Sequence, residues 1–226
     1  MVTTRADRRA ARAAVRADRS GSGPVLEERA PSRFPGAAAK FALFGEVLLV
    51  GLLVVLVGVL VATLPIALAA GIRHLARYIA AEDSRLGLFW RDVRAGIAGG
   101  SVVGLIAAVI AVVLMIDIDL ARSGFLPGGA VIEAVGWTGL AVLAVGLLIA
   151  AGAWDPRRGW RGAVRSVPAI VRSDLRGLVF YVAAVALVVI LTWMLPPLLP
   201  AALGCAVLAV VAVPERQRRV SARDER

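Results

Sequence analysis

The sequence predicts an all-α integral membrane protein, a polytopic helix bundle of about five spans with two amphipathic helices at the membrane interface. Hydrophobic residues make up 59% of its 226 residues and charged residues only 19%. An average soluble domain is about half apolar and about a quarter charged. The apolar residues also fall into blocks, and the first uncharged block runs from Val47 to Ile72. A helix needs about 20 apolar residues to cross the hydrocarbon core of a bilayer, so this block is long enough.

The charges and the residue counts limit the kinds of function that we expect. The formal net charge is +10, and the arginines lie in blocks beside the apolar stretches. Such blocks are typical of the cytoplasmic flanks of spanning helices and attract anionic lipid headgroups, so we do not expect nucleic-acid binding. The chain has one cysteine and one histidine, Cys205 and His74. With no nucleophile–base motif, phosphate loop or metal-ligand cluster in the sequence, we expect neither an enzyme nor a cofactor.

An arginine- and alanine-rich tail, residues 1–40, precedes the predicted transmembrane domain of residues 41–213. Serine, glycine and proline residues interrupt this tail, so we expect it to be flexible. The first span is predicted over residues 44–63, and Glu46 near its start is a candidate acid at the membrane interface. Pro65 follows this span, and a proline lacks the backbone N–H that a helix interior needs. A kink or break is therefore expected next to Pro65.

Two arrangements are open for the chain after this proline. In the first, Arg73 and Arg77 lie four residues apart on one face of an amphipathic helix at the membrane interface. There they are candidate contacts for lipid headgroups or a partner protein. In the second, residues 47–72 form a re-entrant hairpin that returns the chain to its starting side. We base the count of five spans on the first arrangement.

The second span is predicted over residues 95–116, behind an arginine-bearing entry segment. Arg91 and Arg94 in that segment are further candidate contacts for lipid or a partner. Glycines recur every four residues at the start of this span, at Gly96, Gly100 and Gly104. This spacing lets helices pack closely, so we expect a packing role for these glycines.

Asp117 and Asp119 are predicted to end the second span. Residues two apart on a helix point to different sides, so we do not expect these two to hold one ligand jointly. We interpret them as the boundary with water, and a cation or proton site is the alternative because acids inside a membrane are costly. The third span is predicted over residues 131–153, and Glu133 near its start is another candidate interface acid.

A second basic segment follows the third span and is predicted as the second interfacial helix, interrupted near Pro168. Arg161 and Arg165 in this segment are candidate contacts for lipid or a partner. Residues 177–214 carry no charge, and the prolines in their middle predict a tight hairpin of two spans. These fourth and fifth spans are predicted over residues 178–195 and 198–213, before a polar tail of residues 214–226.

The distribution of arginine predicts the orientation in the membrane. The basic internal loops and the basic C-terminus alternate with nearly neutral loops, and basic loops are normally cytoplasmic. We therefore expect a multi-pass protein of the cell membrane with a cytoplasmic C-terminus. The basic N-terminal tail lies outside in the five-span arrangement. It lies inside in the hairpin arrangement, where the rule is obeyed throughout.

The chain resembles the YesL-like family of small bacterial integral-membrane proteins, whose function is unknown. The resemblance covers about residues 41–213 and rests on the order of LPIALAAGIRHLARYIAAED, LGLFWRDVRAGIAGG and the pair Asp117 and Asp119. The long arginine-rich tail departs from the short N-terminus of the family. Family members are often encoded with sugar ABC-transporter genes. The resemblance thus implies an accessory role in carbohydrate uptake, with ABC-transporter subunits as partners, and it implies no catalytic residue.

The sequence therefore predicts an accessory or scaffolding membrane protein that contacts the bilayer, anionic headgroups and a partner protein or a second copy of itself. The last three spans contain few polar side chains, chiefly Thr138, Thr192 and Cys205. Secondary transporters place more polar groups near the membrane midplane. A stand-alone transporter or channel for a small solute is the alternative, with Asp117 or Glu46 as its functional acid.

Overall fold

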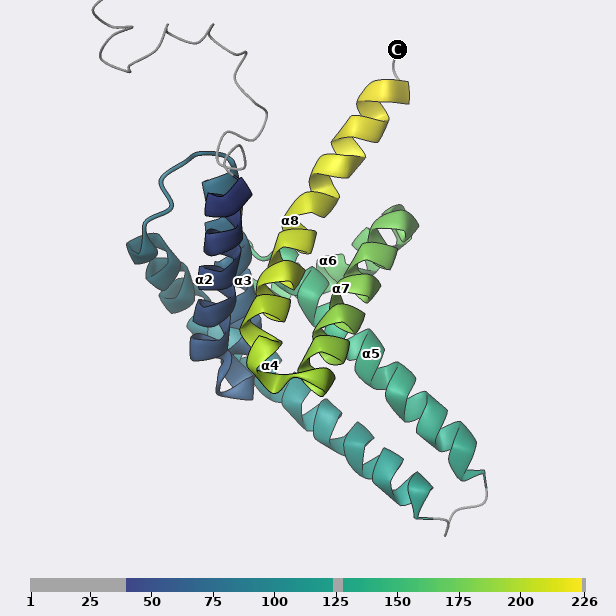
Figure 1. Ribbon diagram of the computed structural model, residues 1–226. Helices are drawn as coiled ribbons and strands as arrows, with labels where there is room; N and C mark the ends of the chain where they lie inside the picture. The colour runs from purple at the N-terminus through teal and green to yellow at the C-terminus, as the bar shows by residue number, and fades with distance from the viewer. Residues whose placement is uncertain (1–39, 124–127, 225–226) are drawn as a thin grey trace, which may run out of the picture.

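All the secondary structure in the described part of the chain is helical (Figure 1). The computed structural model describes residues 40–123 and 128–224, with the backbone alone at residues 176 and 213–224. The helices are α2 (Lys40–Gly58), α3 (Leu64–Ile79), α4 (Leu86–Arg122), α5 (Gly129–Ala153), α6 (Gly159–Ser173), α7 (Leu175–Met194) and α8 (Leu199–Asp224), with short 3-10 helices η2 (Val61–Thr63) and η3 (Pro196–Leu198). The predicted all-α class is confirmed. The predicted flexible tail lies outside the described residues except for Lys40.

The chain reverses direction between α2 and α3. The hydroxyl of Thr63 donates hydrogen bonds to two carbonyls of the preceding turn and so stabilises the reversal. A Cβ atom at Gly71 would meet the side chains of Val50 and Val54, so α3 runs back along α2. Residues 47–72 therefore form two antiparallel helices instead of one span that continues into an interfacial helix. The start of α2 and the end of α3 consequently lie at the same end of this hairpin.

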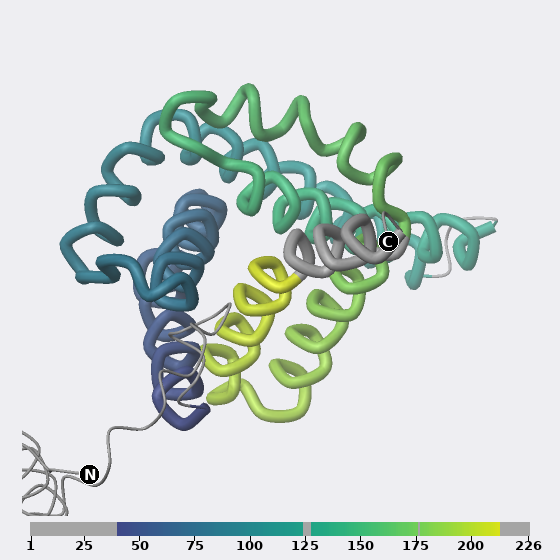
Figure 2. The backbone as a smooth tube through the Cα atoms, turned by 90° about the horizontal axis from the view of Figure 1, so that it is seen from above, coloured from purple at the N-terminus to yellow at the C-terminus, as the bar shows by residue number. Residues whose placement is uncertain are grey.

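Helix α3 lies in the core of the bundle and packs against α2, α4, α5 and α8. Seen from above, α8 stands beside the α2–α3 hairpin (Figure 2). Every residue from Ile66 to Ile72 is buried, which is typical of a helix that is apolar on all sides. The prediction of an interfacial helix at this position is therefore wrong for this half of α3. The expected break next to Pro65 is confirmed, since α3 begins at Leu64 and Pro65 lies in its first turn, where the missing N–H is not needed.

The glycines at the start of the predicted second span make close contacts between helices. A Cβ atom at Gly100 would lie 2.3 Å from the side chain of Ile66, and one at Gly104 would lie 2.0 Å from the carbonyl oxygen of Ala62. No side chain fits at either position unless the backbones separate. The predicted packing role is thus confirmed, and the contacts join α4 to α3 and to the α2–α3 turn.

Three helices are longer or more continuous than predicted. Helix α4 is a single helix of 37 residues that continues through Asp117 and Asp119 to Arg122. Helix α6 continues through Pro168, and α8 continues into the predicted polar tail as far as Asp224. Helices α4 and α8 continue across a change in polarity, and α6 continues through a proline. A change in polarity along the sequence therefore does not end the backbone helix in α4 or α8.

Helices α4 and α5 form a second hairpin that projects beyond the other helices (Figure 1). Gly104 lies at the α2–α3 turn, so the rest of α4, about 27 Å of helix, extends past that turn. Helices α7 and α8 form a third hairpin around η3. The described part of the chain is thus built from three helical hairpins, with α6 between the second and the third.

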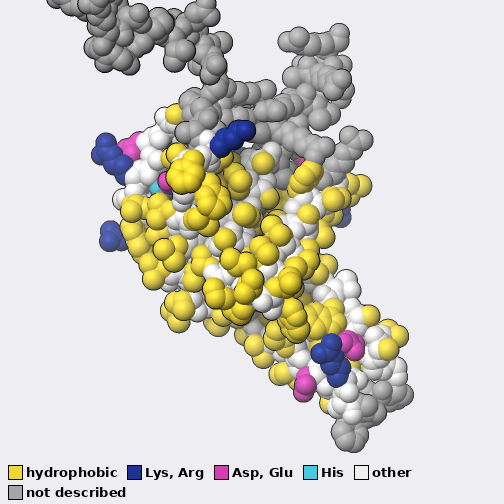
Figure 3. Space-filling model, in the orientation of Figure 1, with side chains coloured by type: hydrophobic (Ala, Val, Ile, Leu, Met, Phe, Trp, Pro, Cys, Tyr) yellow, Lys and Arg dark blue, Asp and Glu magenta, His cyan; other side chains and the backbone are white. Residues whose placement is uncertain are grey.

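Four helices are long and apolar enough to cross a membrane. They are α2, α4, α5 and the Gly177–Met194 part of α7, whereas the apolar segment Pro196–Ala212 is shorter. Many large apolar side chains are exposed, and hydrophobic side chains cover much of the central surface in view (Figure 3). Monomeric soluble proteins rarely expose such an area. The fold is therefore compatible with an integral membrane protein.

Candidate functional site

Charged side chains from four parts of the chain meet at one end of the bundle. This polar cluster consists of Glu46, Arg73, His74, Arg77, Asp92 and Asp155. His74 is 0% exposed and Asp92 is 2% exposed. Charged groups are almost never buried to this extent unless they are paired. The buried polar groups of the cluster must therefore be paired for the fold to be stable.

Asp92 of α4 binds two arginines of α3. Its Oδ2 atom lies 3.2 Å from Nε of Arg73 and 2.5 Å from Nη2 of Arg77. The two arginines are four residues apart and so lie on the same face of α3. Nη1 of Arg73 also lies 3.2 Å from Oδ2 of Asp155, and its guanidinium lies 5.7 Å from the ring centroid of Trp154. Arg73 thus connects α4 to the segment after α5.

Glu46 of α2 and His74 of α3 form a second pair in the cluster. Oε1 of Glu46 lies 2.6 Å from Nε2 of His74, which is a hydrogen-bond distance. The imidazole contacts the edge of the buried Phe89 ring at 6.2 Å between centroids. Nδ1 of His74 has no hydrogen-bond partner among the described residues. This pair joins the two helices of the first hairpin close to its open end.

The ion pairs of the cluster join α3 to α4 and to the segment after α5. Its two arginines and two aspartates balance each other in formal charge, and Glu46 and His74 are hydrogen-bonded to each other. In the described part of the chain no group of three or more His, Cys, Asp or Glu residues is placed to hold a metal ion. The backbone N–H of Arg157 donates to Asp155 at 2.8 Å and lowers the pKa of that carboxyl below its ordinary value, and the charge of Arg73 acts in the same direction.

The structure changes the interpretation of two of the predicted contact residues. The side chains of Arg73 and Arg77 are 30% and 13% exposed, and both face Asp92 instead of an open interface. Glu46, predicted as an interface acid, also belongs to the cluster. The sequence analysis did not predict that His74 and Asp92 belong to the polar cluster. The available signal was the pair of arginines at helical spacing, followed by an acid in the first turns of the next helix.

The other predicted contact residues lie outside the cluster. They are exposed and occupy two different helices, Arg91 and Arg94 on α4 and Arg161 and Arg165 on α6. None of them forms an ion pair with another described residue. Contact with lipid or a partner stays a prediction for these four residues.

The remaining predicted acids lie at the tip of the α4–α5 hairpin, far from the polar cluster. Asp117 and Asp119 are exposed on either side of the buried Ile118, so they point apart as predicted. Oε1 of Glu133 accepts a hydrogen bond from Nε of Arg122 at 2.7 Å and another from the indole of Trp137 at 3.3 Å. Charged side chains thus gather at two ends, with an apolar surface between them (Figure 3).

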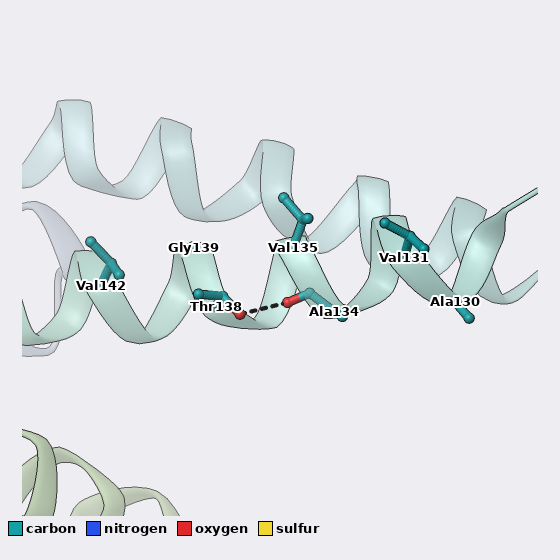
Figure 4. Close-up of a pocket in the computed structure, with 7 residues that line it drawn as sticks. All are labelled: Ala130, Val131, Ala134, Val135, Thr138, Gly139 and Val142. Carbon is teal, nitrogen blue, oxygen red and sulfur yellow. Dashed lines mark hydrogen bonds between the residues drawn. The ribbon is translucent and has the colours of Figure 1, made fainter.

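Several grooves open on the helical surface of the described residues. One of about 790 Å³ lies between α5 and α7 and is lined almost wholly by apolar side chains. A second, about 680 Å³, lies between α4 and α6 and contains three arginines. A shallow pocket of about 620 Å³ follows the outer face of α5 (Figure 4). In that pocket the hydroxyl of Thr138 donates to the carbonyl of Ala134 at 2.7 Å, so it is occupied within its own helix.

The chain was compared with protein-family models, with curated proteins and with solved structures, and none of them matches it. The resemblance to the YesL-like family stays a prediction from sequence motifs.

Proposed function

We propose that the protein is a membrane-embedded accessory or scaffolding subunit that binds a transmembrane helix of a partner in the α5–α7 groove. The observation that carries this proposal is the chemistry of the groove. Of its lining residues only Trp137 and Thr138 bear polar nitrogen or oxygen atoms in their side chains. The hydroxyl of Thr138 is already bound to its own helix. An open groove of this kind offers packing contacts to an apolar helix and few contacts to a polar solute.

The groove also has the small residues that favour helix association in a membrane. Ala141, Ala144 and Gly146 of α5 and Ala186 of α7 line it. A Cβ atom at Gly146 would meet nothing within 4 Å, so the backbone there is open to a partner. Transmembrane helices associate through close packing at small residues, since lipid provides no hydrophobic drive between them.

The arrangement of charges favours this role over a stand-alone transporter. The charged groups of the polar cluster bind one another at one end of the bundle, and the acids of the hairpin tip lie at the other end. The side chains exposed on the intervening helices are mostly apolar (Figure 3). A secondary transporter carries polar groups for its substrate near the midplane. A stand-alone transporter is the alternative function.

The proposal includes a partner class and an orientation. The resemblance to the YesL-like family supports a subunit of a sugar ABC importer as the partner. The basic segments support a cytoplasmic location for the C-terminus. The α2–α3 hairpin supports the same side for Lys40, because it returns the chain to the end where it began. In this orientation every basic segment is cytoplasmic.

A photo-crosslinking amino acid tests the groove in native membranes. We would place it at Val182, which lines the groove and is 50% exposed, and at Val113 on α4, which lies outside the groove and is 51% exposed. The two positions match in residue type and exposure. We expect a discrete protein adduct from position 182 and only lipid adducts from position 113, with mass spectrometry identifying an ABC permease subunit.

Other outcomes distinguish the alternatives. An adduct of twice the chain mass from position 182 would make the partner a second copy of this chain. Lipid adducts alone from both positions would contradict the scaffold proposal. In that case, solute flux in proteoliposomes that is lost in Asp117→Asn or Glu46→Gln would support the transporter.

A further inference from the structure

We propose that the α4–α6 groove is a binding site for one anionic diacyl phospholipid, with its phosphate on the arginines of α6 and an acyl chain along α4. This site is separate from the α5–α7 groove and does not depend on a partner protein. The groove volume is about 680 Å³, within the usual range for ligand sites. The groove has a cationic wall, an apolar wall and a floor formed by Trp160.

The α6 wall carries the positive charge. Arg161 and Arg165 of α6 line the groove four residues apart and so lie on one face of the helix, and Arg158 at the N-terminal cap of α6 lines it as well. All three side chains are exposed, and none forms an ion pair with another described residue. Guanidinium groups bind phosphate through paired hydrogen bonds. The three arginines of this wall are thus free to hold a phosphate diester.

The α4 wall is apolar and belongs to a helix that is long enough to cross a membrane. It consists of Ala98, Gly99, Val102, Val103 and Ile106, which recur at helical spacing and so form one face. None of these side chains has a polar atom. An acyl chain lying on this face would gain packing contacts with it, whereas a free phosphate ion would gain none.

The floor of the groove is fixed by Trp160. Its indole N–H donates to the carbonyl of Gly96 at 3.0 Å, and its ring stacks on Trp154 with 5.9 Å between centroids. A Cβ atom at Gly99 would lie 3.1 Å from Trp160, so the glycine lets α6 approach α4 closely. The groove is therefore preformed by rigid contacts. One cavity with a cationic wall, an apolar wall and a fixed floor matches an anionic lipid and not a soluble anion.

Lipid binding to the purified full chain tests the site. We would use native mass spectrometry with phosphatidylglycerol and with phosphatidylcholine of the same acyl chains. The triple variant R158Q/R161Q/R165Q removes the charged wall. The control variant K40Q/R157Q/R172Q removes the same charge from exposed basic side chains that do not line the groove and are not among the predicted lipid contacts. Since each arginine contributes to anionic-lipid binding, we expect the groove variant to bind phosphatidylglycerol on the order of a hundredfold more weakly, and the control to bind normally.

A second variant tests the apolar wall. Val102→Trp fills the groove from an exposed position without changing any charge, and we expect it to reduce phosphatidylglycerol binding at least about tenfold. The proposal is overturned if Val102→Trp binds lipid normally, if the control triple variant loses as much as the groove variant, or if phosphatidylcholine binds equally well. It is also overturned if glycerol phosphate alone competes as strongly as the lipid. Because no partner is present, none of these results depends on the scaffold role.

Discussion

Asp92 is the residue on which the polar cluster depends most. It is buried and receives both Arg73 and Arg77, so Asp92→Asn would remove the charge that balances two guanidinium groups. Loss of one partner from a buried ion pair costs about 3–5 kcal/mol. We expect the free energy of unfolding of Asp92→Asn in detergent to fall by that order, with a clearly lower unfolding temperature.

An exposed ion pair of the same kind is the control for this change. Asp83 pairs with Arg85 across 3.2 Å, and both side chains are largely exposed. Exposed pairs contribute at most about 1 kcal/mol, so Asp83→Asn should unfold nearly as the unmodified protein does. If Asp92→Asn were equally neutral, the polar cluster would not stabilise the bundle.

Asp155 gives the cluster a defined dependence on pH. The backbone N–H of Arg157 and the charge of Arg73 lower the pKa of its carboxyl in the folded state. A lowered pKa stabilises the fold above the unfolded-state value of about 3.9 and ceases to do so as the pH falls through the folded value. Below about pH 4 the unfolding temperature of the unmodified protein should fall. We expect a smaller fall for Asp155→Asn, because its side chain does not titrate. Identical acid profiles for the two proteins would contradict this contribution.

The sequence made part of the polar cluster predictable. Arg73 and Arg77 stood out because of their spacing, and Glu46 because it is an acid beside an apolar run. Their partners were not predictable, because Asp92 is brought to the arginines only by the way α4 packs against α3. The sequence of α4 alone does not distinguish Asp92 from the other charged residues of the polar segment at the start of this helix.

At the scale of helices, the crossing of α2 and α8 depends on glycine. A Cβ atom at Gly51 would lie 1.8 Å from the carbonyl oxygen of Pro200, so Gly51→Ala forces these helices apart. A Cβ atom at Gly45 on the same helix would meet nothing within 4 Å, so Gly45→Ala is the matched control. We expect Gly51→Ala to destabilise the protein by about 1–3 kcal/mol in detergent unfolding. Gly45→Ala should be neutral or slightly stabilising, because alanine favours helix.

Equal effects from the two substitutions would mean that the α2–α8 contact is looser than the structure has it. The distinction between the two glycines is invisible in the sequence, since both lie in the same apolar helix.

Hydrophobicity predicted where α5 and α7 begin and end to within a few residues, because charged or turn residues bound them. It failed at α4 and α8, where the helix continues through charged residues.

At the scale of the whole molecule, the sequence left the path of the first apolar block open. The α2–α3 turn consists of residues 59–63, which carry no charge, so two antiparallel helices read as one continuous apolar run. Hydropathy measures composition and does not register a reversal that occurs without polar residues. The reversal becomes visible only through contacts between distant residues, such as Glu46 with His74.

The reversal leads to the prediction that decides the orientation. Lys40 begins α2, and the exposed Arg85 lies in the loop after α3, so the hairpin places both at one end of the bundle, whereas Asp119 lies near the tip of the α4–α5 hairpin. Single cysteines at these three positions, in a Cys205→Ser background, can be labelled in intact cells with a membrane-impermeant maleimide. Because basic segments face the cytoplasm, we expect labelling only at position 119, and labelling at positions 40 and 85 after permeabilisation. In the five-span arrangement position 40 would instead be labelled in intact cells while position 85 stays protected. That result would mean that the α2–α3 hairpin opens in the membrane.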